Sequence, residues 1–354
     1  YTMDRGSYIG SEDPEVTPAV FLPHFSTSTQ GIIGFDIGPD VGTTREIGNL
    51  DLSSFTNGVY VGTASATYDE GGEVNGPGLR LTGTLTPGSD GHHRFAAYKG
   101  GALEVASVLS GASTRVYIGE PNTLGTMGDP TKEEYSTVLL TGENTHGGTT
   151  TLYAGRLLLG HEQALGTGAL VVQPHNITLP GESSSDIHAE LGVYAPEMEG
   201  GVFTLANPIQ LNATLSINDF EPLRLSGPIS GSGGLDLQED ASLELTSDNT
   251  FSGGIYLRPY AGLTIASSTA TGTGQLGFGG GSYSDVYVKT DNPIIHGLDS
   301  REDSDYASFH LYQEATLFKV VQPEGTDTKF VGDIHSDAYE GYRSEEHTSE
   351  LQSR

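Results

Sequence analysis

Aspartates in the second half of the chain are the side chains best suited to hold a metal ion. Asp299, Asp303 and Asp305 are closely spaced, and Asp285 lies in a Gly280–Val288 stretch that partly matches the calcium-binding pattern GGxGxDxUx. Oxygen ligands suit calcium, but the first cluster lacks the glycine and the final glutamate of an EF-hand loop. The second motif occurs once, whereas a calcium roll needs several stacked copies. We predict solvated loops with no resident metal, and keep calcium as the alternative cofactor.

No residue pattern in the chain predicts catalysis. His92 and His93 follow Asp90, but adjacent residues on a strand point to opposite faces, so the pair would chelate poorly; we expect a surface loop. The chain has no Gly-x-Ser-x-Gly nucleophile elbow and no Gly-x-x-x-x-Gly-Lys phosphate loop. It also lacks the Asn-Thr-Asp, Asp-Asp, Gly-His-Gly and Arg-Ile-Lys strings expected of pectin-cleaving enzymes. We therefore predict a non-enzyme.

Composition excludes several classes of partner. The 354 residues include 16 Lys and Arg against 46 Asp and Glu, a net charge of −30, which opposes binding to nucleic acid. With no cysteine, the chain has no disulfide scaffold and no cysteine-ligated metal centre. No apolar run is long enough for a transmembrane helix, so we expect no membrane insertion. The opening at Tyr1, without a signal peptide, predicts a fragment of a longer chain.

The elements that must position any site are short β-strands. Leu79-Arg-Leu81, Leu223-Arg-Leu225, Leu235-Asp-Leu237 and Leu243-Glu-Leu245 alternate apolar and polar residues, the period of half-buried strands. Gly-Gly and Ala-Gly turns separate them rather than Asn-Gly hairpin pairs. Such turns favour chains that turn a corner and stack coil upon coil. A helix-like turn is expected only near Pro130 to Tyr135.

One motif occurs twice. Leu139 to Leu159 is LLTGENTHGGTTTLYAGRLLL, and Leu243 to Ile265 is LELTSDNTFSGGIYLRPYAGLTI. Both continue into a similar tail, Ala164-Leu-Gly-Thr-Gly168 and Ala270-Thr-Gly-Thr-Gly274, so the repeats cover 139–172 and 243–274. The shared positions that we expect to be structural are Asn144, Gly147, Gly148, Gly155, Asn249, Gly253, Gly254 and Gly262. Asparagine at a corner can bond a stacked neighbour, and glycine lets the chain turn where a Cβ would clash.

This motif resembles the autotransporter-associated β-strand repeat, also called the passenger-associated transport repeat. His146 departs from the family pattern, which usually has an aromatic residue there, and one residue is missing beside it, which predicts a shortened turn. The resemblance implies an all-β fold, a right-handed parallel β-helix or solenoid. It also implies a bacterial protein, secreted or displayed on the outer face of the outer membrane, with a missing C-terminal barrel or anchor on the same chain.

We expect four segments. Residues 1–78 are a β-rich segment, either early coils or a small β domain ahead of the helix; 79–284 form the β-helix; 285–342 are further coils or a disrupted cap. Residues 343–354 resemble translated sequencing-adapter read-through and are expected to be a non-native tail.

The repeats favour a non-catalytic display stalk of an autotransporter-like protein. One alternative is an adhesin or glycan-binding β-helix, whose partner would be a surface glycan or host matrix and whose exposed tyrosines would stack on sugar rings. A second alternative is a polysaccharide lyase or hydrolase with its site here or on a missing segment.

Overall fold

The computed structural model describes residues 1–38, 43–68, 74–119, 136–173, 189–194, 201–218, 222–279, 283–300, 307–312, 318–321, 329–330, 332–336, 347–348 and 351–352. They are almost entirely strand and turn. Helix among them is limited to α1 (Pro18–Phe21) and η1 (Leu22–His24), which the sequence pattern did not predict. The helix-like turn expected near Pro130 to Tyr135 lies outside the described residues. No described helix has the length and apolar character needed to cross a membrane.

The chain forms two compact units, Tyr1–Glu190 (unit 1) and Leu191–Arg354 (unit 2). In unit 1 two parallel sheets dominate. The strands of the first, in spatial order, are β1 (Tyr8–Ser11), β2 (Ile32–Phe35), β5 (Tyr60–Thr63), β10 (His93–Ala97), β12 (Val116–Ile118), β14 (Thr150–Leu152) and β16 (Leu170–Val172). Those of the second are β3 (Arg45–Ile47), β8 (Leu79–Leu81), β11 (Ala102–Val105), β13 (Thr137–Leu140) and β15 (Gly155–Leu159). The chain alternates between the two sheets, as expected of a solenoid.

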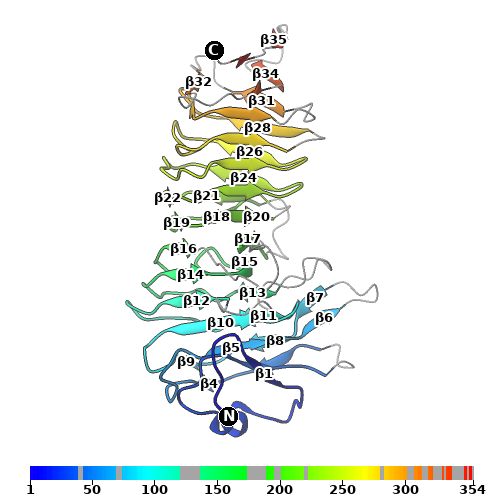
Figure 1. The fold of residues 1–354 in the computed structure, drawn as a ribbon, viewed down its shortest axis with the longest axis vertical. Coiled ribbons are helices and arrows are strands. Elements are labelled where there is room, and N and C mark those ends of the chain that lie inside the picture. Colours follow the sequence, from blue (N-terminus) through cyan, green and yellow to red (C-terminus); the bar gives the residue numbers. More distant parts are fainter. Residues whose placement is uncertain are drawn as a thin grey trace, which may run out of the picture. The chain divides into compact units, whose positions relative to one another are not determined.

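Unit 2 has the same organisation. One parallel sheet contains β18 (Phe203–Leu205), β21 (Leu223–Leu225), β24 (Ser242–Leu245), β26 (Gly262–Ile265), β28 (Ser284–Val288), β31 (Ala307–Leu311) and β34 (Gly332–Ser336). The other contains β20 (Leu215–Ile217), β23 (Leu235–Leu237), β25 (Ile255–Leu257), β27 (Leu276–Phe278) and β30 (Leu298–Ser300). Figure 1 shows β24, β26 and β28 lying one above another. β17 (Ala189–Val193) includes the boundary between the units.

A third side completes the coils, mostly as short parallel pairs. These are β4 (Leu50–Asp51) with β9 (Leu85–Thr86) in unit 1, and β29 (Ile294–Ile295) with β32 (Lys319–Val320) in unit 2. In unit 2, β19 (Ile209–Leu211) and β22 (Ile229–Gly231) also pair in parallel on this side, as the last two strands of a nine-stranded sheet. Antiparallel pairing among the described residues is limited to β6 (Ala66–Tyr68) with β7 (Val74–Pro77), β33 (Lys329–Phe330) with β36 (Leu351–Gln352), and β34 with β35 (His347–Thr348).

Stacked leucines fill the interior. Leu223 pairs in register with Leu243, and Leu243 with Leu263, so each of these coils takes 20 residues. All three leucines are at most 1% exposed, whereas the residue after each of them, Arg224, Glu244 or Thr264, is partly exposed. Stacking like residues in register buries a continuous apolar column that no single coil could bury alone. The predicted β fold with long parallel sheets is thereby confirmed, and it is consistent with a parallel β-solenoid.

Candidate functional site

The two repeat asparagines connect three consecutive coils. Asn249 is 3% exposed; its Oδ1 accepts the backbone N–H of Ile229 at 2.7 Å, and its Nδ2 donates to the carbonyl of Ala270 at 2.7 Å. Asn144, 2% exposed, does the same with Leu109 N–H at 2.7 Å and the Ala164 carbonyl at 2.6 Å. In each unit the amide therefore satisfies a backbone donor on the preceding coil and an acceptor on the following one.

The residues after each asparagine form the third side of the coil. Thr250 and Ser252 donate their backbone N–H groups to Ile229 and Gly231, and Thr273 donates to the carbonyl of Phe251. In unit 1, Thr145 and Gly147 donate to Leu109 and Gly111, and Thr167 donates to the carbonyl of His146. The segment thus pairs with the coils on both sides, although it lacks the alternating pattern of a strand.

The repeat glycines differ in what they do. A Cβ on Gly147, Gly148 or Gly253 would lie 2.3–2.5 Å from backbone of the preceding coil, and one on Gly254 would lie 2.4 Å from the carbonyl oxygen of Gln275 on the next coil. Gly254 and Gly155 also have positive φ angles, of 82° and 80°. A Cβ on Gly262 would meet nothing within 4 Å, so no close backbone contact requires glycine at this repeat position.

His146 and Phe251 occupy equivalent positions, and both are 0% exposed. His146 bonds Thr150 through Nε2 at 3.1 Å, where the second repeat has Phe251 and Ile255. β14 begins at Thr150 and β25 at Ile255, in each case six residues after the asparagine. The turn at His146 is therefore not shortened, contrary to our prediction, because the glycine pair moves by one residue and the strand start does not.

His93 is the first residue of β10 and is 5% exposed, so the predicted surface loop ends at His92 and does not include His93. Burial, together with the nearby His146 and His92, lowers the pKa of His93 to about 4. Burial also lowers the pKa of His146. His93 is thus neutral in the folded protein at neutral pH.

Unit 1 should lose stability as the pH falls from about 6.5 to about 4. In this window the unfolded chain protonates His93 and the folded chain does not, so the unfolded state binds more protons. The shift corresponds to about 3 kcal/mol at pH 4. Urea unfolding at pH 7 and pH 4.5 should show a smaller acid loss for His93→Leu than for wild type. The exposed His24→Leu is the control; equal acid loss in wild type and His93→Leu contradicts the assignment.

Of the acidic candidates, Asp285 and Asp299 lie among the described residues, and they are on different sheets. Asp285 lies on β28, and its Oδ1 is 3.1 Å from Nε2 of His310. Its register partners on the adjacent strands are Gly262 and Ser308. Asp299 lies on β30, in the other sheet of unit 2, beside Gly277. Asp303 and Asp305 lie outside the described residues. One carboxylate with a histidine does not supply the six or more oxygens that calcium takes, and no described group of three or more His, Asp or Glu residues is arranged to hold a metal.

A buried polar network in the first coils was missed by sequence reasoning. Asp36 accepts hydrogen bonds from Tyr8 Oη at 2.5 Å, Thr63 Oγ1 at 3.0 Å and the Ala64 N–H at 2.7 Å. Arg45, 8% exposed, donates to the carbonyls of Ser11 and Asp36. Because Asp36 Oδ1 bonds Tyr8 on β1 and Thr63 on β5, the strands on the two sides of β2, the network ties neighbouring coils together.

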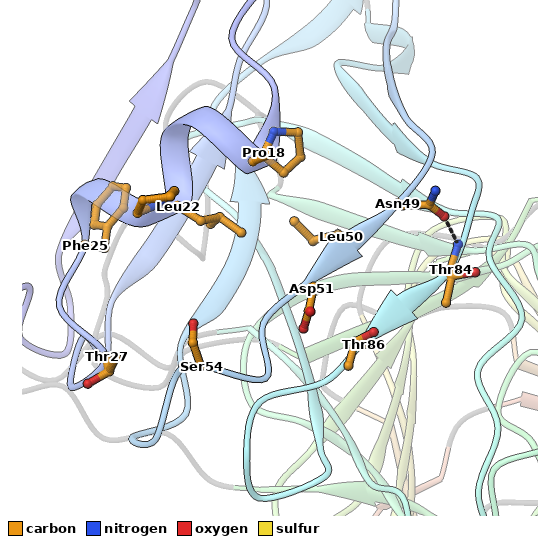
Figure 2. A pocket seen from close by; sticks show the side chains of 12 residues that line it. Pro18, Leu22, Phe25, Thr27, Asn49, Leu50, Asp51, Ser54, Thr84 and Thr86 are labelled. Carbon is orange, nitrogen blue, oxygen red and sulfur yellow. Dashed lines mark hydrogen bonds between the residues drawn. The ribbon is translucent and has the colours of Figure 1, made fainter.

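An open groove of about 790 Å³ lies between the α1–η1 segment and the β4–β9 pair. Figure 2 shows Pro18, Leu22 and Leu50 facing it, with Asn49 Oδ1 accepting the Thr84 N–H at 2.9 Å. Asp51 is its one acidic lining residue, and hydrogen bonds from Ser53 lower the pKa of that carboxyl. With no second carboxylate, histidine or cation among the residues that line it, the groove lacks an acid–base pair.

Comparison with known proteins adds no assignment: a scan of protein-family models, a search of curated proteins and a search of solved structures each returned no match.

Proposed function

We propose that this chain is a non-catalytic display stalk of a secreted or surface-exposed bacterial protein, built as a right-handed parallel β-solenoid of the autotransporter-associated repeat type. The observation that supports it most is the asparagine corner, which makes the same two inter-coil bonds in unit 1 and in unit 2. The same corner geometry in both units stabilises the stacking of coils, and this structural role requires no active site.

The outer faces also suit a stalk. Arg80 on β8 pairs with Glu104 at 3.1 Å and Glu46 at 3.5 Å, its register partners on the adjacent strands. Arg224 pairs with Glu244 at 2.8 Å in the same manner. Partly exposed ion pairs of this kind contribute little stability. They do, however, use several of the few Lys and Arg side chains of a chain whose net charge is −30. The remaining negative charge opposes lateral association of copies.

Location on the cell surface is the first test. Intact cells of the source bacterium would be treated with a protease and the released peptides identified by mass spectrometry. We expect peptides of this chain to be released without lysis, while a cytoplasmic marker stays intact. Protection of the chain until the cells are lysed would overturn the proposal.

The enzymatic alternative is tested separately. The purified chain would be incubated with a panel of polysaccharides, with and without calcium, and assayed for new reducing ends and unsaturated products. We expect neither product, since the described residues present no acid–base pair in a groove. Product formation that rises with the concentration of the chain would contradict the stalk proposal and support the lyase or hydrolase alternative.

A further inference from the structure

Six successive strands of the first sheet of unit 1 bring polar and aromatic side chains to one small pocket. Its volume is about 200 Å³, enough for about seven waters or one sugar ring. The lining residues lie on or next to β1, β2, β5, β10, β12 and β14: Arg5, Gln30, Asn57, Gly58, Tyr60, Arg94, Tyr117 and Tyr153.

Arg94 is held rigidly at this pocket. Its guanidinium makes a two-pronged contact with Asp90, at 2.6 Å and 3.2 Å, and lies over the ring of Tyr117 with Cζ 4.8 Å from the centroid. A Cβ on Gly58 would come within 2.9 Å of that Cζ, so the absence of a side chain there leaves the space that the guanidinium occupies. Bidentate pairing and cation–π contact fix a planar donor group in advance of binding.

Two tyrosines form a flat wall. The rings of Tyr117 and Tyr153 are stacked, with centroids 6.3 Å apart and planes 14° from parallel. Neither phenol hydroxyl bonds another residue in the part of the chain that the structure describes. The wall therefore offers ring faces together with hydroxyls that keep their hydrogen-bonding capacity, a combination suited to an amphipathic ligand.

The other residues that line the pocket supply hydrogen-bond donors. Arg5 uses Nε to bond Gln30 at 3.1 Å, and this is its one hydrogen bond among the described residues, which leaves its Nη groups as donors. Asn57 donates Nδ2 to the carbonyl of Ser28 at 3.2 Å. Two of the 16 Lys and Arg residues of a chain of charge −30 thus line a single pocket, with one of them lacking a carboxylate partner in the described structure.

We propose that this pocket binds one residue of an acidic saccharide, a sugar ring that carries a carboxylate. The ring packs against Tyr117 and Tyr153, Arg5 pairs with the carboxylate, and the amides of Gln30 and Asn57 contact ring hydroxyls. Stacking and a charge-assisted bond are complementary in this geometry because the aromatic wall and Arg5 line the same cavity. The proposal does not depend on the display-stalk function.

Calorimetric titration of the full chain tests it. The probes are oligomers of galacturonate and glucuronate and an N-acetylneuraminate-terminated trisaccharide, each beside its neutral counterpart: the methyl esters for the uronates and lactose for the third. At least one acidic probe should bind, and its neutral counterpart should bind about tenfold more weakly or not at all. No binding by any probe, or equal binding of acidic and neutral forms, overturns the proposal.

Two variants locate the site. Arg5→Gln should lower affinity for the acidic probe about tenfold and leave weak binding of the neutral probe unchanged. Tyr153→Leu should lower affinity for both several-fold, because stacking does not depend on charge. Arg115→Gln, which removes the same charge from an exposed position that does not line the pocket, should change neither. Equal effects of Arg5→Gln and Arg115→Gln, with circular dichroism unchanged, would contradict the site.

Discussion

Asn249→Ala should destabilise unit 2 by about 3 kcal/mol. The substitution leaves the Ile229 N–H and the Ala270 carbonyl without their partner, and both residues are at most 1% exposed. Each orphaned buried group costs about 1–3 kcal/mol. Urea unfolding would measure the lost stability, and hydrogen exchange of peptides from residues 222–279 would show that the loss lies in this part of unit 2.

Asn212→Ala is the matched control for this substitution. Asn212 is only partly buried and accepts one bond from exposed Gln210, so its loss should cost less than about 0.5 kcal/mol. Asn144→Ala should reproduce the effect of Asn249→Ala in peptides from residues 136–173. An Asn249 variant as stable as the Asn212 variant would show that the corner bonds do not stabilise the coils.

Gly254→Ala should be among the most damaging single-methyl changes in the second repeat. Its Cβ would lie 2.4 Å from the Gln275 carbonyl oxygen, and its φ of 82° is unfavourable for any residue with a side chain. Because the obstacle is backbone, the next coil must move, which we expect to cost about 3 kcal/mol or more. Thermal unfolding, together with hydrogen exchange of peptides from residues 222–279, would measure this loss of stability.

Gly262→Ala provides the comparison within the same repeat. Gly262 lies in β26 with open space around the Cβ position, so alanine should be neutral or stabilise by up to about 1 kcal/mol. If both variants lost the same stability, the steric account of Gly254 would be wrong.

The strands and their stacking were predictable because local pattern and long-range packing agree. Leu223-Arg-Leu225 and Leu243-Glu-Leu245 alternate so that leucines point inward in register, and no hairpin turn chemistry competes with parallel stacking. Asn144 and Asn249 could be singled out because the same residue type returns in the same context. The sequence could predict that each asparagine side chain bonds a stacked neighbour. Which backbone groups it bonds, 20 or more residues away, could be seen only in the structure.

The third side of the coils and the pocket lined by Arg5 and Tyr153 escaped sequence reasoning, each for its own physical reason. The Thr145–Gly147 segment pairs with the neighbouring coils through backbone groups, so this pairing needs no alternation of side chains. The pocket joins Arg5, Gln30, Arg94 and Tyr153 from strands whose spacing along the chain varies, since coils carry insertions of different length. Without a fixed period, no motif reveals which residues meet.

In-register stacking is the claim on which the account depends, and the cysteine-free chain allows a direct test. Gln210 on β19 and Ser230 on β22 are exposed register partners, so Gln210→Cys with Ser230→Cys should form a disulfide under mild oxidation. Gln210→Cys with Arg224→Cys, closer in sequence but on a different sheet, should remain reduced. Peptide mass spectrometry after oxidation would identify the linked pairs. Closure of the Gln210–Ser230 pair alone is the predicted result; closure of the Gln210–Arg224 pair instead would contradict the solenoid.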